Sequence, residues 1–147
     1  MDDDSRHHAS GYRPYGLYRR RNGRGLQDIF GALDLGTNNC RLLVARPTAQ
    51  GFKVIDAFSR IVRLGEGLHE SGRLSNAAIT RTIDALDVCA DKIYRRQAAH
   101  VRCVATQACR AAINGEDFLR QARQRTGLTF EIITPEEEAR LAVLGSL

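Results

Sequence analysis

Three short polar stretches carry the residues of this sequence that could do chemistry, and each one follows an apolar run. The first is residues 34–41, DLGTNNCR, which lies between two such runs. Backbone N–H groups from Gly36 through Cys40 could form a nest for an anion such as phosphate, with the Thr37 and Asn39 side chains as further donors. Two apolar runs joined by Gly-Thr-Asn-Asn are equally typical of a plain β-hairpin with positive φ angles at its tip. The residues alone leave both interpretations open.

The other two stretches supply charged side chains. In ATQACRAA, Arg110 follows an apolar run, where a guanidinium can hold a phosphate through two parallel hydrogen bonds. In TPEEEAR, Glu136, Glu137 and Glu138 stand where a helix is expected to begin. The helix dipole favours acids at this position whatever their function. Residue type therefore supports a functional carboxylate and simple dipole complementarity about equally.

Elements that could position these residues follow one another from residue 29 onward. The predicted order is strands at 29–35, 41–46 and 51–64, a loop at 65–72, a long helix from Ser75, a strand at 100–106, a short helix at 107–113, a helix capped by Asn114, a strand at 128–134, and a helix from Pro135. Strand–helix alternation after an opening hairpin predicts an α/β layer fold with a mixed sheet.

The long helix shows the clearest periodicity. Ser75 is a typical N-cap residue, and an apolar face follows it at helical spacing: Ile79, Ile83, Leu86, Ala90 and Ile93. The opposite face carries Arg81, Asp84, Asp91, Arg95 and Arg96, which we interpret as a solvated surface. We expect the 36–40 turn and Arg110 to meet at one anion site, because α/β folds bind ligands where strands end.

Composition limits the classes to which the protein can belong. The 147 residues suit one domain with a real core, and no apolar run approaches the roughly 18 residues that a membrane helix needs. No signal peptide is recognisable at the start. The four cysteines form no C-x-x-C pair, so we interpret them as reduced thiols in a cytoplasmic protein without a structural metal.

The N-terminal 28 residues differ from the rest. They alternate arginine with tyrosine and glycine, at Arg13, Arg19–Arg21 and Arg24 and at Tyr12, Tyr15 and Tyr18. Such a composition predicts a disordered basic leader that does not pack on the domain. The alternative is a segment that binds nucleic acid through phosphate contacts and stacking.

The motifs together resemble a known family. Asp34-Leu35-Gly36-Thr37-Asn38 followed by Arg41-Leu42 is similar to the first phosphate motif of the actin-like ATPase superfamily, which includes sugar kinases, actin and DnaK-type chaperones. With RIVRLGEGL (60–68), VATQACRAAING (104–115) and EIITPEEEARL (131–141), residues 32–147 resemble the N-terminal half-domain of the exopolyphosphatase/guanosine pentaphosphate phosphohydrolase (Ppx/GppA) family. The resemblance implies a ribonuclease H-like, actin-like half-domain.

The resemblance also implies a reaction and roles for residues. Water would attack the terminal phosphoryl of polyphosphate or the 5′ γ-phosphoryl of guanosine pentaphosphate, and the preference between them stays open. Glu138 matches the carboxylate that orients and deprotonates that water, and Arg110 matches a phosphate-binding arginine. The cradle would be Gly36, Thr37, Asn38, Asn39 and Cys40, with Asp34 near Mg²⁺, through water.

Two departures from the family pattern affect this reading. Asn39 stands where serine is common, and an amide can still donate a hydrogen bond. The sequence also ends before any D-x-G-G-G-S-like second phosphate motif. We therefore expect half of a catalytic unit whose partner is a C-terminal half-domain, inactive alone; a homodimer is also compatible. The alternatives are a non-catalytic phosphate- or nucleotide-binding module, a kinase fragment, and an arginine-rich nucleic-acid-binding protein.

Overall fold

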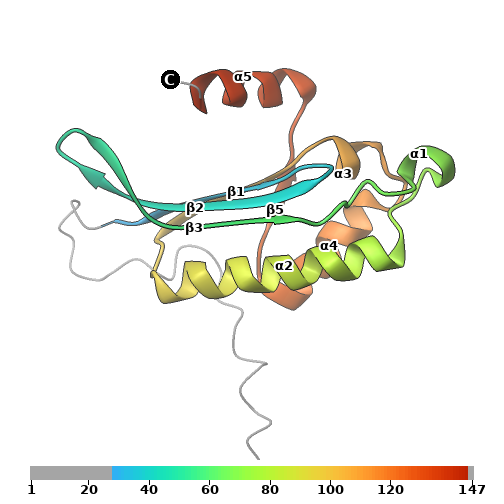
Figure 1. Ribbon diagram of the computed structural model, residues 1–147, viewed down its shortest axis with the longest axis horizontal. Coiled ribbons are helices and arrows are strands. Elements are labelled where there is room, and N and C mark those ends of the chain that lie inside the picture. The colour runs from blue at the N-terminus through green and yellow to red at the C-terminus, as the bar shows by residue number, and fades with distance from the viewer. Residues whose placement is uncertain (1–27, 146–147) are drawn as a thin grey trace, which may run out of the picture.

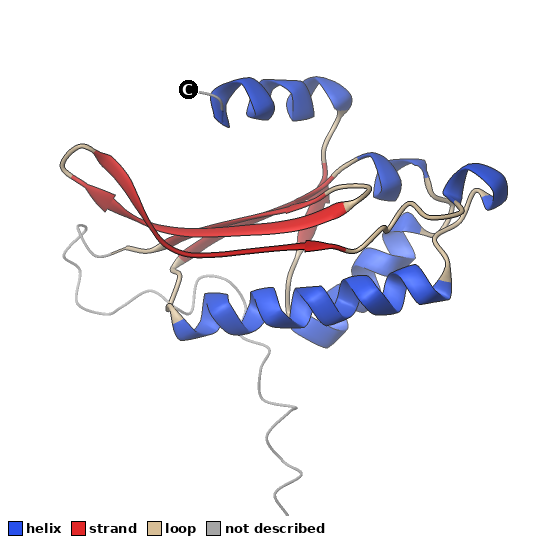
Figure 2. Ribbon diagram, viewed as in Figure 1, coloured by secondary structure: helices blue, strands red, loops and turns tan. Residues whose placement is uncertain are grey.

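A computed structural model describes residues 28–145 of the chain. The elements are β1 (Phe30–Leu35), β2 (Asn39–Thr48), β3 (Gly51–Ile61), α1 (Leu68–Ser71), α2 (Asn76–Arg95), β4 (His100–Ala105), α3 (Gln107–Ala111), α4 (Gly115–Thr126), β5 (Phe130–Ile132) and α5 (Pro135–Gly145). The strands form one sheet in the order β3-β2-β1-β4-β5. Helices α2 and α4 cover one face, and α5 lies on the other side (Figures 1 and 2).

The sheet is mixed, as the sequence predicted. Strands β1, β2 and β3 pair antiparallel, whereas β4 pairs parallel with β1 and β5 parallel with β4. Helix α2 lies in the crossover from β3 to β4, because β4 runs parallel to β3 and a hairpin cannot join parallel strands. The predicted α/β fold with a mixed sheet and flanking helices is therefore confirmed.

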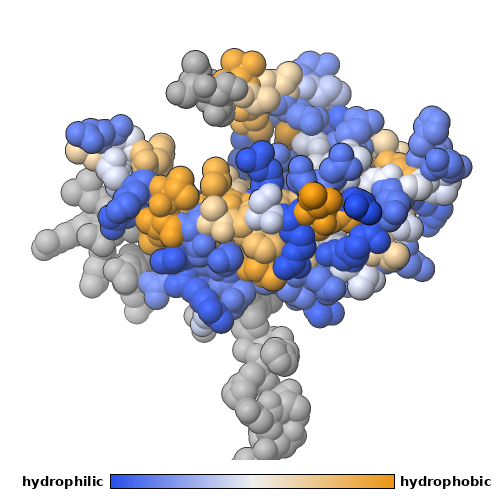
Figure 3. Space-filling view, viewed as in Figure 1, coloured by the Kyte–Doolittle hydropathy of each residue, from blue (hydrophilic) through white to orange (hydrophobic). Residues whose placement is uncertain are grey.

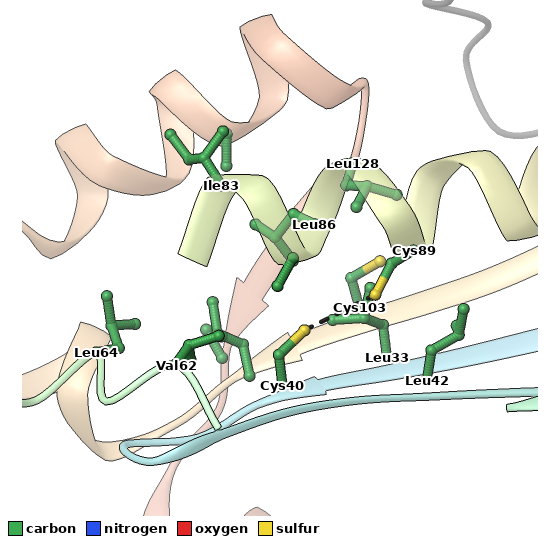
Figure 4. Packing of buried hydrophobic residues seen from close by; sticks show 14 of the residues in the cluster. Leu33, Cys40, Leu42, Val62, Leu64, Ile83, Leu86, Cys89, Cys103 and Leu128 are labelled. Carbon is green, nitrogen blue, oxygen red and sulfur yellow. Dashed lines mark hydrogen bonds between the residues drawn. The ribbon is translucent and has the colours of Figure 1, made fainter. Parts of the chain in front are cut away.

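Alternation along β1 and β2 decides which face of the sheet is buried. Leu33, Leu35, Leu42 and Val44 are buried on the face toward α2 and α4, where period-2 spacing places them together. Ile83, Leu86 and Cys89 of α2 pack onto the same layer (Figure 4). All four cysteines are reduced and buried, and the Sγ atoms of Cys40 and Cys89 lie 3.8 Å apart.

Both predicted helix caps stand at their expected places, but only one of them caps. The Ser75 hydroxyl accepts a hydrogen bond from the Ala78 N–H, as predicted. Asn114 precedes α4 without a side-chain cap; its amide instead accepts from the Leu74 N–H at 2.8 Å and donates to the Leu74 carbonyl at 3.0 Å. The cap prediction failed because a partner 40 residues away competes for the same amide.

Three other local predictions need correction. The predicted loop at 65–72 contains the short helix α1, and the predicted strand at 128–134 is ordered as strand only over Phe130–Ile132. No residue of the 36–39 turn has a positive φ angle among the described residues. The register pairs Leu35 with Cys40, which leaves four residues in the connection, and loops of that length do not need the left-handed conformation of a two-residue turn.

Of the predicted leader, only Asp28 is described; its carboxylate lies 3.1 Å from Nε2 of His100. The predictions for residues 1–27 lie outside the described residues. Within the described part, no helix is long and apolar enough to cross a membrane.

Candidate functional site

Three connections meet at one edge of the sheet. Because β1, β4 and β5 run parallel, the segments that follow them leave the sheet at the same end. These segments are the 36–39 turn, the Thr106–α3 junction and the Ile133–α5 junction. Two backbone hydrogen bonds join them, from the Thr106 N–H to the Leu35 carbonyl (3.1 Å) and from the Ile133 N–H to the Ala105 carbonyl (3.0 Å).

The turn is fixed by the loop that follows β3. The Gly36 N–H bonds the Asn39 carbonyl at 3.0 Å, and the Gly65 N–H bonds the Thr37 carbonyl at 3.0 Å. A Cβ at Gly65 would overlap Cγ2 of Thr37, so the loop packs against the turn with no room for a side chain at position 65. Within the described residues, the N–H groups of Thr37 and Asn38 donate to no partner. Donors held in place without protein partners are what an anion cradle requires.

Gly36 is not explained by the protein's own packing. Its φ angle is not positive, and an added Cβ would meet only ordinary contacts, at 3.7 Å from the Asn39 carbonyl oxygen and 3.9 Å from Oγ1 of Thr106. Neither strain nor crowding therefore demands glycine here. A glycine that lets another molecule approach the backbone closely fits this position better.

Arg110 is held by the end of β5. Its N–H bonds the Thr106 carbonyl in α3, one turn back. Nη1 donates to the Ile133 carbonyl at 2.5 Å, and Nη2 donates to Oε1 of Gln107 at 2.7 Å and to Oε2 of Glu138 at 3.4 Å. The guanidinium is thus oriented on both sides, with its side chain 24% exposed.

The charge of Glu138 in α5 acts on the carboxyl of Asp34 in the sheet. Glu138 lies in the first turn of α5, where its N–H bonds the Thr134 carbonyl at 2.9 Å. Asp34 points to the side of the sheet that carries α5. Loss of water around its carboxylate raises the pKa of Asp34 although the residue as a whole is exposed, the negative charge of Glu138 raises that pKa further, and Arg41 opposes both. Arg41 is paired with Asp34 in the β1–β2 register.

Sequence reasoning missed the residue that ties α5 to the sheet. Arg102 of β4 donates from Nε to Glu131 of β5 at 2.5 Å and from Nη2 to Glu137 of α5 at 3.3 Å. These bonds raise the pKa of Arg102, and the bond from Arg102 lowers the pKa of Glu137. Opposite charges on neighbouring predicted strands, Arg102 and Glu131, were the available signal.

The structure thus gathers Asp34, Arg110, Glu138 and the turn at one edge of the sheet. Cys40 is the exception among the predicted site residues, because its side chain is fully buried beside Cys89 and only its backbone can take part. No group of three or more potential metal-ligating side chains occurs within residues 28–145. The carboxylates of Asp34 and Glu138, which interact electrostatically, nonetheless fit Mg²⁺, which is commonly held by one or two carboxylates, waters and substrate phosphates.

Comparison with known proteins gives a consistent result. The model of the Ppx/GppA phosphatase family matches residues 43–147. The match begins after the 34–41 turn. A crystal structure of the Aquifex aeolicus member of that family is 35% identical, with a TM-score of 0.76, over 80% of this chain and 39% of that one.

Two further solved structures agree. An exopolyphosphatase-like protein is 32% identical, with a TM-score of 0.72, over 76% of this chain and 34% of its own. An exopolyphosphatase from Cytophaga hutchinsonii is 24% identical, with a TM-score of 0.74, over 78% of this chain and 36% of its own, and supports the fold alone. The chain therefore spans well under half the length of these relatives.

Proposed function

Because this chain belongs to the Ppx/GppA phosphatase family, we propose that it forms the phosphate-binding half of a phosphohydrolase site. At that site water attacks the terminal phosphoryl group of inorganic polyphosphate or the 5′ γ-phosphoryl group of guanosine pentaphosphate. The observation that carries the proposal is the meeting of Arg110 and Glu138, 3.4 Å apart, beside Asp34 and the donor-rich turn. The four reduced thiols fit a reducing compartment, so the proposed setting is the cytoplasm.

In this proposal the turn and Arg110 bind the phosphoryl group. The N–H groups of Thr37 and Asn38 donate to its oxygens, and Gly36 leaves room for them. Arg110 approaches from α3 with its guanidinium already oriented by the Ile133 carbonyl and Gln107. Phosphoryl transfer depends mainly on positioning and on neutralising charge, and fixed donors supply both without reorganising during the reaction.

Glu138 is the proposed general base. A base must lie within hydrogen-bond reach of the water that it activates, and Glu138 lies directly beside the guanidinium proposed to hold the phosphoryl group. Asp34 and Glu138 together present carboxylate oxygens where Mg²⁺ would be held, in part through water. When bound, the ion would neutralise charge on the phosphate oxygens. The positive charge of Arg41, which is paired with Asp34, would offset part of the repulsion between the carboxylates of Asp34 and Glu138.

The opposite wall of the cleft is proposed to come from a second half-domain. The Aquifex aeolicus relative is more than twice as long as the part that this chain matches, which supports that view. Proximity and orientation can contribute on the order of 7–11 kcal/mol to lowering a barrier. A phosphoryl group held from one side forgoes much of that contribution, so we propose that this chain alone binds phosphate weakly and turns over negligibly.

The decisive test is Glu138→Gln in a chain that includes the second half-domain. Glutamine keeps the shape and a hydrogen bond to water but cannot accept its proton, so kcat for phosphate release should fall by about 10²–10⁴-fold. Binding of polyphosphate, measured by calorimetry, should stay nearly unchanged. Glu136→Gln, on the exposed part of the same helical turn, is the matched control and should keep full activity. Full activity of the Glu138→Gln variant would exclude Glu138 as the base.

A non-catalytic phosphate-binding module is the second candidate, and it is favoured by the one-sided site. It predicts that tripolyphosphate binds to the 147-residue chain and that no phosphate is released even when the second half-domain is supplied. Phosphate release by the longer chain would reject it.

A further inference from the structure

One residue beside the turn has a backbone conformation that its side chain does not favour. Arg63 has a φ angle of 49°, in the left-handed region that glycine and asparagine adopt more readily. Gln97, with a φ angle of 55°, is the other non-glycine residue of this kind among those described. Gln97 follows the C-terminus of α2, where a left-handed residue commonly ends a helix. Arg63 follows a strand, and no helix end explains it.

The backbone of Arg63 is fixed to the candidate site. Its N–H donates to the Asn38 carbonyl at 3.1 Å, the same carbonyl that accepts from the Val62 N–H at 2.8 Å. The Arg63 carbonyl accepts from the Glu66 N–H at 3.1 Å and from Nη2 of Arg81 at 3.3 Å. Arg81, which we had interpreted as part of a solvated face, therefore fastens this loop in place.

The side chain of Arg63 has no structural task in the described part of the protein. Its neighbours Val62 and Leu64 are fully buried, whereas the side chain of Arg63 is exposed and its guanidinium forms no hydrogen bond or ion pair with any residue of 28–145. The arginines nearby are occupied differently. Arg81 pairs with Glu66, and the guanidinium of Arg60 lies over the ring of Phe58.

We propose that Arg63 is a further anion-binding residue, which contacts the second or third phosphoryl group of a polyphosphate chain whose terminal phosphoryl group lies on the 36–40 turn. This inference rests on the proposed function. A guanidinium reaches about 6 Å from its Cα, and the Arg63 backbone is hydrogen-bonded to the turn itself. A strained residue retained beside a site is usually retained for what its side chain does there. Arg63 thus makes the site selective for a chain of phosphates over a single one.

The test uses the whole 147-residue chain and calorimetric titration with inorganic tripolyphosphate and with orthophosphate, both in the presence of Mg²⁺. Arg63→Asn and Arg63→Gly remove the charge while suiting the left-handed backbone, so the loop and the thermal stability should be preserved or improved. We expect a roughly tenfold loss of tripolyphosphate affinity in both variants and less than a twofold change for orthophosphate. Arg63→Lys should lose less, because one charge remains.

Arg46→Asn is the matched control. Arg46 is an equally exposed arginine seven residues along β2 from the turn, about 23 Å away at strand spacing. An equal loss of affinity in Arg46→Asn, unchanged tripolyphosphate affinity in Arg63→Asn, an equal loss for orthophosphate, or no binding by the unaltered chain would each overturn the proposal. Its failure is distinguishable from that of the hydrolytic function, because that function is tested separately, by phosphate release from the Glu138→Gln variant of the longer chain.

Discussion

At the scale of single residues, the contact between Gly65 and Thr37 shows how closely the site is built. Glycine at position 65 is required by space, since a Cβ there would overlap Cγ2 of Thr37. Glycine at position 36 is required by neither space nor backbone conformation. The two glycines therefore differ in role. Gly65 is explained by packing inside the protein, and Gly36 is better explained by the close approach of a ligand to the backbone.

Gly65→Ala should consequently damage both stability and phosphate binding. The added methyl group must displace Thr37 and with it the turn, at a cost of about 1–3 kcal/mol in the free energy of unfolding. Urea denaturation and tripolyphosphate titration measure the two effects. Thr37→Ser removes Cγ2 but keeps the hydroxyl donor, so the double variant Gly65→Ala/Thr37→Ser should regain most of both. If the double variant is no better than Gly65→Ala, the damage arises elsewhere.

The sequence identified several candidate site residues, but it did not predict the hydrogen-bond partners of other residues that hold the structure together. Arg110 could be chosen because it follows a predicted strand, whereas Asp34 and Glu138 were chosen through the resemblance of their motifs to the family. The tasks of Asn114, Arg81 and Arg102 could not be foreseen. Each is set by a partner between 15 and 40 positions away in the chain, at Leu74, Glu66 and Glu131. Local patterns contain no information on such distances.

At the scale of elements, Asp56 joins the hairpin strand β3 to the end of helix α2. Its Oδ1 accepts from Nζ of Lys92 at 3.1 Å, and its Oδ2 accepts from Nε of Arg96 at 3.2 Å. Burial disfavours ionisation of this carboxyl, but the hydrogen bonds from Lys92 and Arg96 outweigh it and lower the pKa of Asp56 below its ordinary value of 3.8. Arg96 and Lys92 thus act structurally, although the sequence suggested that Arg96 is only solvated.

Asp56→Asn should therefore destabilise the protein at neutral pH, by about 1 kcal/mol. A carboxyl whose pKa is lowered by folding stabilises the native state above its unfolded pKa, and this contribution disappears as the pH falls through the folded pKa. The stability difference between the two proteins should accordingly be constant from pH 7 to pH 5 and vanish in acid. Thermal unfolding at a series of pH values measures it. Asp91→Asn, which breaks an exposed pair with Arg95, should show almost no difference at any pH, and equal behaviour of the two variants would contradict the assignment.

At the scale of the whole molecule, the sheet has a core on one face only. Helices α2 and α4 bury that face, and α5 stands over the other, fastened at its first turn through Glu137 and Glu138 (Figure 1). Large apolar side chains remain exposed along the edge strand β3, at Phe52, Val54 and Ile61, and apolar patches are visible in the band of the strands in Figure 3. The strands and their order along the chain follow from local periodicity. The pairing of β1 with β4 rests on long-range packing instead, and the strand–helix alternation predicted only that the sheet is mixed.

Because all four cysteines are buried, the rate at which their thiols react with a reagent reports how often the native structure opens. Cys40, Cys89, Cys103 and Cys109 are all closed to solvent, and burial raises the pKa of Cys109 to about 12. A coloured aromatic disulfide reagent should therefore react with none of the four thiols in the native protein within the time in which it labels all four in denaturant. The slow labelling under native conditions then measures how often the helices and the sheet separate around each cysteine. Cys40 reports on β2, the strand that begins at the turn. Tripolyphosphate should slow the labelling of Cys40, because a ligand that binds only the closed form lowers the population of the open form by the factor 1 + [L]/Kd. Immediate reaction of one thiol in the native protein, identified by peptide mapping, would show which layer opens first without unfolding the rest.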